Sequence, residues 1–272
     1  MSIIIGGTIA IDNVSTPSAA AENLLGGSAA YASLAASYFC QSAHLVGVVG
    51  HDFPEEHLTM LESHGVTLTG VERSDGESFT WSGEYHENMN DRTTHRVGLN
   101  VLEDWELDIP GEIAASRIVV PANMSPDNQI QMLDQCAAEE RFVVADTMDL
   151  WIEIANERLH EVMQRIDLLV INEGEAREFA GTSNLILAGE KLLEKGPTYV
   201  VIKLGEFGAI LFGPDESIFR FHAWPLRDIT DPTGAGDTFL GAMAGYLASL
   251  GGVDFTFAQI RDAILRGSIL AS

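Results

Sequence analysis

Short runs of β-branched residues alternate with helical stretches along most of the chain. Such runs suit strands buried on both faces, and the segments between them have the 3.6-residue spacing of amphipathic helices. The alternation predicts strands over 3–11, 43–50, 117–122, 142–147, 167–172, 198–205, 208–213 and 217–222. It predicts helices over 29–39, 54–65, 126–138, 150–165, 173–180, 185–195, 234–250 and 256–271. Together they indicate an α/β fold in which helices cover both faces of a mostly parallel sheet.

One stretch, 66–100, has a different pattern. Its runs VTLTGVE, SFTWSGEYH and THRVGLN alternate polar and apolar residues, with no helix between them. This predicts two to four antiparallel strands that form a small β subdomain or lid. No repeat or low-complexity linker divides the chain. We therefore expect one domain over 1–272 with a β lid inserted at about 66–100.

The charge is strongly one-sided. The 272 residues hold 40 Asp and Glu against 15 Lys and Arg, a formal charge of -25, and 46% of them are apolar. That apolar content excludes a disordered chain. The negative surface disfavours nucleic-acid and membrane partners and is also found in salt-adapted proteins. An anionic substrate would have to be held by local N–H groups, a metal or a few buried cations.

The two cysteines, Cys40 and Cys136, form no metal-binding or disulfide pattern. The first residues lack a basic segment and include Asp12, so we expect no signal peptide. No apolar run reaches the ~18 residues that span a bilayer. These features favour a reduced, cytoplasmic compartment.

The segment DPTGAGDTF, Asp231 to Phe239, carries the clearest chemistry. Gly234, Ala235 and Gly236 precede a helix, where free backbone N–H groups form an anion hole. Asp237 falls in the first turn beside that hole, placed to accept a proton from a substrate hydroxyl. The alternative is a glycine-rich turn with a capping aspartate.

This segment resembles the C-terminal signature of the PfkB (ribokinase-like) carbohydrate kinases. The resemblance extends over nearly the whole chain, through the Gly26-Gly27 pair, LVGVVGHDF, INEGEA (Ile171 to Ala176) and VIKLGEFGAIL. INEGEA is similar to the family's Asn-x-x-Glu motif. The resemblance implies a Rossmann-like three-layer sandwich and an ATP-dependent kinase of the cytoplasm.

The resemblance also implies roles at the reaction centre. Asp237 would be the catalytic base, and Gly234, Ala235 and Gly236 would hold the phosphoryl group in transit. Asp231 matches the place where many relatives hold a K⁺ ion. Considered alone, Asp231 is equally a turn residue ahead of Pro232.

On the nucleotide side, Asn172 would face the ATP phosphates, and Glu175 would orient Mg²⁺ through water. Considered alone, the pair is a helix cap. Gly205 and Gly208 would shape the turn over the phosphates. Lys203 stands where relatives often have Thr, and in so acidic a chain it favours a phosphate contact.

On the acceptor side, Asp12, Gly26, Gly27 and Tyr31 would bind the substrate, although Asp12 is equally an Asx-turn residue. Tyr31 replaces the Asn of many sugar kinases, which argues against a ribose-type acceptor. We expect phosphorylation of a small sugar or polyol. The alternatives are a nucleoside kinase and a non-catalytic ligand-binding relative. A sugar phosphate would have to be bound by Arg92 and Arg96.

The lid strands are too few to be stable alone. In similar kinases such strands pair across a homodimer, which predicts a dimer through 66–100 with Trp81 or Tyr85 buried in it. Asn88, Asn90 and Arg92 would then lie near the acceptor pocket.

Overall fold

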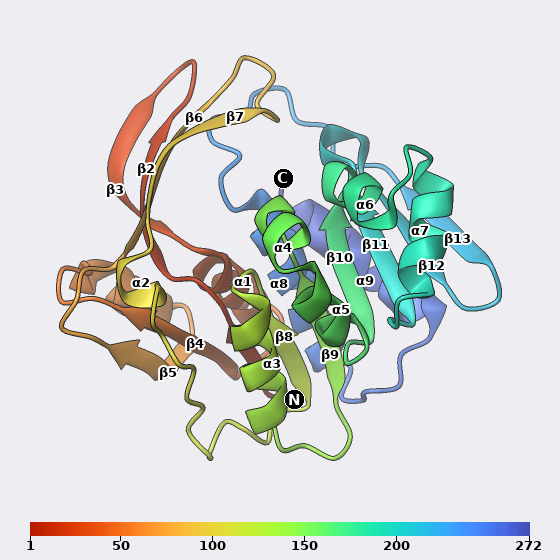
Figure 1. Cartoon of the computed structure of the whole chain (residues 1–272), viewed down its shortest axis with the longest axis horizontal. Coiled ribbons are helices and arrows are strands. Elements are labelled where there is room, and N and C mark those ends of the chain that lie inside the picture. Colours follow the sequence, from red (N-terminus) through yellow and green to blue (C-terminus); the bar gives the residue numbers. More distant parts are fainter.

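The main sheet has nine strands, and the computed structural model describes residues 1–272 (Figure 1). Seven strands are parallel, and near one edge β12 runs antiparallel to both of its neighbours, β11 and β13. In spatial order they are β13 (Ser217–Phe221), β12 (Ala209–Gly213), β11 (Tyr199–Lys203), β10 (Leu168–Asn172), β9 (Phe142–Asp146), β8 (Ile118–Pro121), β1 (Ile3–Gly6), β4 (Ala43–Val49) and β5 (Val66–Arg73). The α/β class expected from the sequence is confirmed.

Helices cover both faces of this sheet because its strands are apolar on both sides. In β1, Ile3 and Ile5 point into one core, and Ile4 points into the other. The first core is covered by α1 (Ser28–Ser37), α2 (Glu55–Ser63), α8 (Ala235–Ser249) and α9 (Phe257–Leu270). The second is covered by α3 (Pro126–Gln135), α4 (Asp149–Ile154), α5 (Asn156–Met163), α6 (Glu173–Ala180) and α7 (Leu185–Leu193). Two short 3₁₀ turns span Asn100–Leu102 and Gly205–Phe207.

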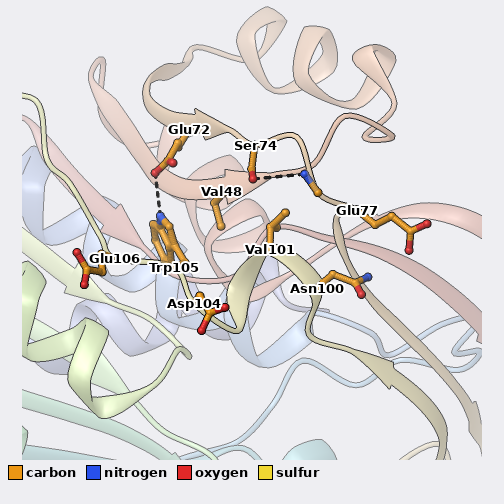
Figure 2. Close-up of a pocket in the computed structure, with 10 residues that line it drawn as sticks. Val48, Glu72, Ser74, Glu77, Asn100, Val101, Asp104, Trp105 and Glu106 are labelled. Carbon is orange, nitrogen blue, oxygen red and sulfur yellow. Dashed lines mark hydrogen bonds between the residues drawn. The ribbon is translucent and has the colours of Figure 1, made fainter.

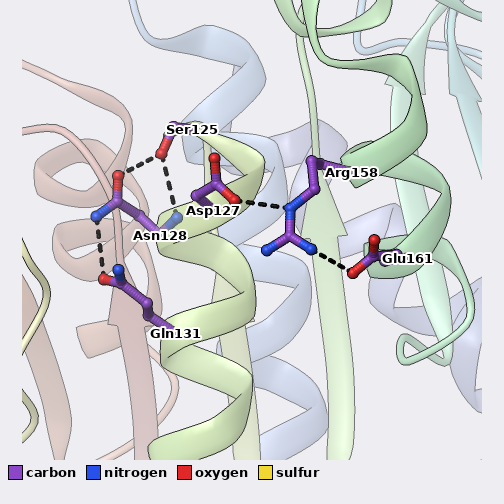
Figure 3. Close-up of polar contacts among 6 residues, drawn as sticks. All are labelled: Ser125, Asp127, Asn128, Gln131, Arg158 and Glu161. Carbon is purple, nitrogen blue, oxygen red and sulfur yellow. Dashed lines mark hydrogen bonds and ion pairs between the residues drawn. The ribbon is translucent and has the colours of Figure 1, made fainter.

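Polar contacts fix the second helical layer at its surface (Figure 3). Ser125 caps α3 by accepting the amide of Asn128 at 3.1 Å, as expected for a Ser-Pro helix start. Arg158 of α5 bridges to Asp127 of α3 at 2.7 Å and to Glu161 at 2.5 Å. The single helix predicted over 150–165 is in fact two, because the backbone of Ala155 leaves helical geometry.

The lid is built from different strands than the sequence predicted. It is a four-stranded sheet in the order β3 (Ala20–Gly26), β2 (Ala10–Ser15), β6 (Phe79–Tyr85) and β7 (Arg92–Gly98). The strand β5, expected in the lid, instead pairs with β4 as the edge of the main sheet. Half of the lid therefore comes from residues 10–26, outside the predicted insertion.

The strand predicted over 3–11 divides between the two sheets. The chain leaves the main sheet after Gly6, and Thr8 then exchanges hydrogen bonds with Ser28, whose amide donates to Thr8 Oγ1 at 2.9 Å. A side chain at Gly7 would meet Ser28 Oγ at 2.7 Å, so only glycine permits this crossing. The lid consequently stands over the carboxyl ends of the parallel strands (Figure 1), where open α/β sheets bind ligands.

Candidate active site

The helix α8 begins in the DPTGAGDTF segment. Gly234 precedes it with a φ of 74°, a left-handed conformation that glycine adopts without strain. The amide of Ala235 donates to the carbonyl of Pro232 at 3.2 Å, whereas the amides of Gly234, Gly236 and Asp237 donate to no backbone carbonyl. Free N–H groups at a helix start can bind an anion. The free amides at this turn include that of Asp237, whereas that of Ala235, predicted to be free, is already bonded.

Lys203 reaches the same turn from the end of β11. A Cβ placed on Gly236 would lie 2.9 Å from Lys203 Nζ, so the ammonium group sits directly over this glycine. Asn172 is the register partner of Lys203 on β10. The sheet thus brings the anion site, the lysine and the Asn172 motif to one edge.

Two carboxylates lie beside this ammonium group. Burial raises the pKa of Asp237, and the charges of Lys203 and Arg92 oppose that rise. Asp146, at the end of β9, is 6% exposed, and its Oδ1 has no hydrogen-bond partner. Burial and the neighbouring Asp237 raise the pKa of Asp146 well above its ordinary value. Asp146 was missed by sequence reasoning, because VADT carries no signal beyond a strand end.

Asp12, predicted to bind the acceptor, lies close to two other residues predicted for that role, Gly26 and Tyr31. Its carboxyl group lies directly against Gly26, where a Cβ would overlap it. Burial, with the charges of Asp237 and Asp231, raises the pKa of Asp12 to about 7. The Tyr31 ring packs on Gly234, 2.6 Å from where a Cβ would stand. Asp12, Tyr31 and the turn before α8 are therefore neighbours.

Two other predicted residues shape backbone here. Gly27 has a φ of 97°, and a Cβ on it would overlap the backbone of Thr8. Asp231 Oδ1 accepts the amide of Thr233 at 2.9 Å, which closes an Asx turn ahead of the anion site.

Asn172 and Glu175 form a capping box at the start of α6. Asn172 Oδ1 accepts the amide of Glu175 at 2.9 Å, and Glu175 Oε2 accepts the amide of Asn172 at 2.9 Å. Burial raises the pKa of Glu175, with Lys203 opposing the rise. The cap and the proposed metal role are compatible, because Glu175 keeps a second carboxylate oxygen.

The donor set suits a magnesium ion that is carried by phosphates. No three acidic, histidine or cysteine side chains are grouped to hold a metal by themselves. Mg²⁺ keeps several waters and needs only one or two carboxylates besides substrate phosphates. Glu175 and the unpartnered Oδ1 of Asp146 supply such a pair.

The turn after β11 has the predicted glycines. Gly205 and Gly208 have φ values of 55° and 94°. A Cβ on Gly208 would overlap the carbonyl of Phe221, and one on Gly205 would lie 3.1 Å from Asn90 Oδ1 of the lid. The lid tip, the loop between β6 and β7 that contains Asn90, therefore lies against the turn from Gly205 to Gly208.

Two clefts flank these elements. One of about 640 Å³ lies between the lid tip and α6 and contains Asn172 and Glu175. The other, about 590 Å³, lies beside β5, where Trp105 donates to Glu72 at 3.1 Å (Figure 2). The second cleft carries four carboxylates and none of the predicted site residues.

Comparison with known proteins agrees with this arrangement. The profile described as pfkB family carbohydrate kinase matches residues 10–272. The chain belongs to this family. Its members are kinases, and the assembled base, anion site and nucleotide turn fit an ATP-dependent kinase.

A cytidine kinase of Thermococcus kodakarensis is 28% identical over 252 residues, 90% of this chain and 88% of that protein. A putative ribokinase II from E. coli, in complex with ATP and Mg²⁺, superposes with a TM-score of 0.80 at 18% identity, covering 100% of this chain and 93% of that one. A Burkholderia thailandensis nucleoside kinase in complex with inosine superposes at 0.77 and 17% identity, covering 100% and 91%. No helix of the chain is long and apolar enough to cross a membrane.

Proposed function

We propose that this protein transfers the γ-phosphoryl group of Mg-ATP to a hydroxyl of a small uncharged sugar, free or within a nucleoside. The observation that carries the proposal is Asp237, set at the free-amide turn of α8 with Lys203 above Gly236. The acceptor oxygen attacks phosphorus, its proton passes to Asp237, and the bond to the leaving ADP breaks. The amides of Gly234, Gly236 and Asp237 hold the phosphoryl oxygens.

The residues of this chain divide the remaining work. Lys203 and Asn172 bind the ATP phosphates, and the turn from Gly205 to Gly208 covers them. Glu175 and Asp146 would hold a magnesium ion through water, and that ion would neutralise phosphate charge. Asp12 accepts acceptor hydroxyls, with Gly26, Gly27 and Tyr31 shaping its side of the pocket.

The charge of the acceptor side selects neutral substrates. Asp12, Asp231 and Asp237 lie close enough for their charges to raise the pKa values of Asp12 and Tyr31. A sugar phosphate would meet repulsion there. The lysine-poor composition supports the same choice.

A nucleoside is the second candidate acceptor, favoured by two observations. The relative matched over 90% of this chain is a cytidine kinase. The Tyr31 ring also lies against Gly234, where a base would stack on the acceptor side. Both observations weigh against the interpretation that Tyr31 excludes a ribose-type acceptor.

Acceptor-dependent ADP release from Mg-ATP tests the proposal. A panel of sugars, polyols, nucleosides and sugar phosphates should give turnover with a neutral member. Asp237→Asn should lower that turnover by ~10²–10⁴ while nucleotide binding is retained. Turnover of no acceptor would favour a non-catalytic relative, and a variant within a few-fold of wild type would remove Asp237 from its role.

Glu175 has its own test. Glu175→Gln keeps the capping box, which accepts Glu or Gln, but removes the charge. The Mg²⁺ concentration for half-maximal activity should therefore rise, without the loss of stability that removal of a helix cap causes. Gln259→Ala, which removes the equivalent cap of α9, should lower stability and leave Mg²⁺ dependence alone. An unchanged Mg²⁺ dependence in Glu175→Gln would reduce the residue to a cap.

We further propose a K⁺ ion behind the anion site, held by loop carbonyls near Asp231. Equal activity in K⁺ and in a bulky organic cation would remove the idea. The enzyme would act in the cytoplasm, which the buried, unpaired thiols of Cys40 and Cys136 support.

A further inference from the structure

Gln129 is a buried polar residue on the face of α3 that packs against the main sheet. The other side chains of this face, Ile130, Met132 and Leu133, belong to the apolar core. Gln129 is 1% exposed, although an apolar side chain would suit such a position. Burying an amide costs free energy unless its donors are bonded, so the partners of Gln129 indicate its role.

The side-chain amide of Gln129 donates to three backbone carbonyls. Its Nε2 lies 3.1 Å from the oxygen of Pro121, 3.2 Å from that of Ala122 and 3.1 Å from that of Asp146. Pro121 is the last residue of β8, Ala122 follows it, and Asp146 is the last residue of β9. One amide group therefore joins the carboxyl ends of two neighbouring strands.

The strands β8 and β9 depend on this link because their own pairing stops early. The last pair between them joins Val119 to Val143. Beyond that point Asp146 pairs with Val170 of β10 and with no residue of β8. On the side that faces β8, Gln129 takes the place of ladder hydrogen bonds in fixing the backbone of Asp146.

Asp146 lies beside the nucleotide motif. Its register partner Val170 precedes Asn172 by two residues on β10. The Asp146 carboxylate is buried, and its Oδ1 has no hydrogen-bond partner in the chain. Because an aspartate side chain is short, the position of its backbone decides where this oxygen lies.

The same amide is connected to the acceptor side through β8. Ser28 Oγ, at the start of α1, donates to the carbonyl of Asn123 at 2.9 Å, one residue after Ala122. The helix α1 also carries Tyr31. Gln129 thus lies between the strand end that contacts α1 and the strand end that carries Asp146.

We propose that Gln129 is a positioning residue, which fixes the backbone of Asp146 relative to β8 and so directs the Asp146 carboxylate toward the magnesium of Mg-ATP. This inference rests on the proposed function, in which Asp146 and Glu175 hold that ion through water. The rival role is structural only, the satisfaction of carbonyls at the strand ends.

Gln129→Met tests the role, because methionine has a similar length and no donor. Gln135→Met is the matched control on the same helix. Gln135 also joins α3 to another segment, since its Nε2 donates to the carbonyl of Leu107 at 2.6 Å and its Oε1 accepts the amide of Ile109 at 2.8 Å. Both variants should lose stability in urea denaturation, because each leaves buried polar groups without a partner.

Nucleotide binding separates the two variants without depending on turnover. In Gln129→Met, calorimetry should show affinity for ADP reduced ~10-fold with Mg²⁺ and changed less than about threefold with EDTA. Gln135→Met should bind ADP as wild type does in both conditions. Gln129→Asn keeps the amide but is one methylene shorter, so it cannot reach both strand ends. It should show the same selective loss, and it replaces Gln129→Met if that variant does not fold.

A double-mutant cycle with Asp146→Asn tests whether Gln129 acts through Asp146. In that case the affinity for ADP with Mg²⁺ should be equally low in Asp146→Asn and in the double variant. A structural role predicts instead that the two losses add. With the acceptor found in the panel, kcat should fall ~10–100-fold in Gln129→Met and stay at the wild-type value in Gln135→Met.

Four outcomes overturn the assignment: affinity for ADP with Mg²⁺ as high in Gln129→Met as in Gln135→Met, an equal loss with Mg²⁺ and with EDTA, additive losses in the cycle, or wild-type affinity in Asp146→Asn. Failure of the proposed function would appear instead in wild type, as absent ADP release with every acceptor. The two failures are therefore distinguishable.

Discussion

At the residue scale, Asp12 shows how burial changes a carboxyl group. The side chain is 5% exposed, its Oδ1 has no partner, and two further aspartates lie nearby. The pKa of about 7 therefore differs from the ordinary value of 3.8 because the charged form is poorly solvated. The folded protein holds a proton there that the unfolded chain releases.

Asp12→Asn should remove the loss of stability that a buried, charged carboxylate causes. Between pH 4 and 7 wild type loses stability as pH rises, because the folded state binds the extra proton. The loss from Asp12 is complete above pH 7 and is on the order of 4 kcal/mol. Thermal denaturation should therefore show the variant more stable than wild type at pH 8 and equal to it near pH 4.

The raised pKa values of Asp146 and Asp237 also make stability depend on pH, in wild type and variant alike. The quantity to measure is therefore the difference in stability between wild type and Asp12→Asn at each pH. The KM of the acceptor should rise in the variant, since the carboxylate is lost. An equal loss of stability at both pH values would show that Asp12 is held by unseen hydrogen bonds.

Some site residues were predictable because their signal is local. The turn from Asp231 to Asp237 depends on glycine conformation and a helix start, both readable from consecutive residues. Asp146 depends on three strands ending at one edge, which no window of sequence contains. The sequence predicted Arg92 near the acceptor pocket, whereas it lines the cleft that contains Asn172 and Glu175. Its position depends on how the lid crosses the main sheet, which local sequence does not report.

At the element scale, the contact between α1 and α8 depends on small residues. A Cβ on Gly241 would overlap the backbone of Ala32, and one on Gly245 would lie 2.7 Å from Ala36 Cα. The helices thus approach until their backbones touch. This holds the start of α8, and with it Asp237, against the helix that carries Tyr31.

Gly241→Ala should destabilise the protein by about 1–3 kcal/mol, because overpacking forces the helices apart. Helix propensity alone predicts the opposite sign, since Ala is favoured over Gly by up to ~1 kcal/mol. Urea denaturation measures the difference. Gly252→Ala is the matched control, because its Cβ would meet nothing within 4 Å. A stabilised Gly241→Ala variant would mean that the contact is loose.

Elements with strong periodicity were predicted well, and the two errors in strand assignment share one cause. The amino-acid composition of β5 and of β2 suits a strand of the lid as well as a strand of the main sheet. Their assignment depends on partners: β5 pairs with β4, whereas β2 pairs with β6, about 70 residues away. Periodicity indicates that one face of a strand is buried, but it does not indicate to which sheet the strand belongs.

At the scale of the whole molecule, the lid is the part that exposes unpaired strand edges and apolar side chains. Its edge strands β3 and β7 are exposed along most of their length. Val97 and Leu99 at the end of β7 are 50% and 47% exposed. Exposed strand edges and apolar side chains of this kind favour pairing with another strand. Tyr85, by contrast, is already buried within one chain.

We therefore expect a homodimer paired through the lid. Sedimentation at micromolar concentration should give twice the 29.4 kDa of one chain. Val97→Asp should shift the protein to monomer by placing a charge in the interface. Ile269→Asp, at a residue 53% exposed on α9, should leave the dimer intact. If lid pairing supports the acceptor site, the KM of the acceptor should rise in Val97→Asp only. A wild-type monomer that phosphorylates its acceptor at full rate would show that each lid works alone, with its outer face in solvent.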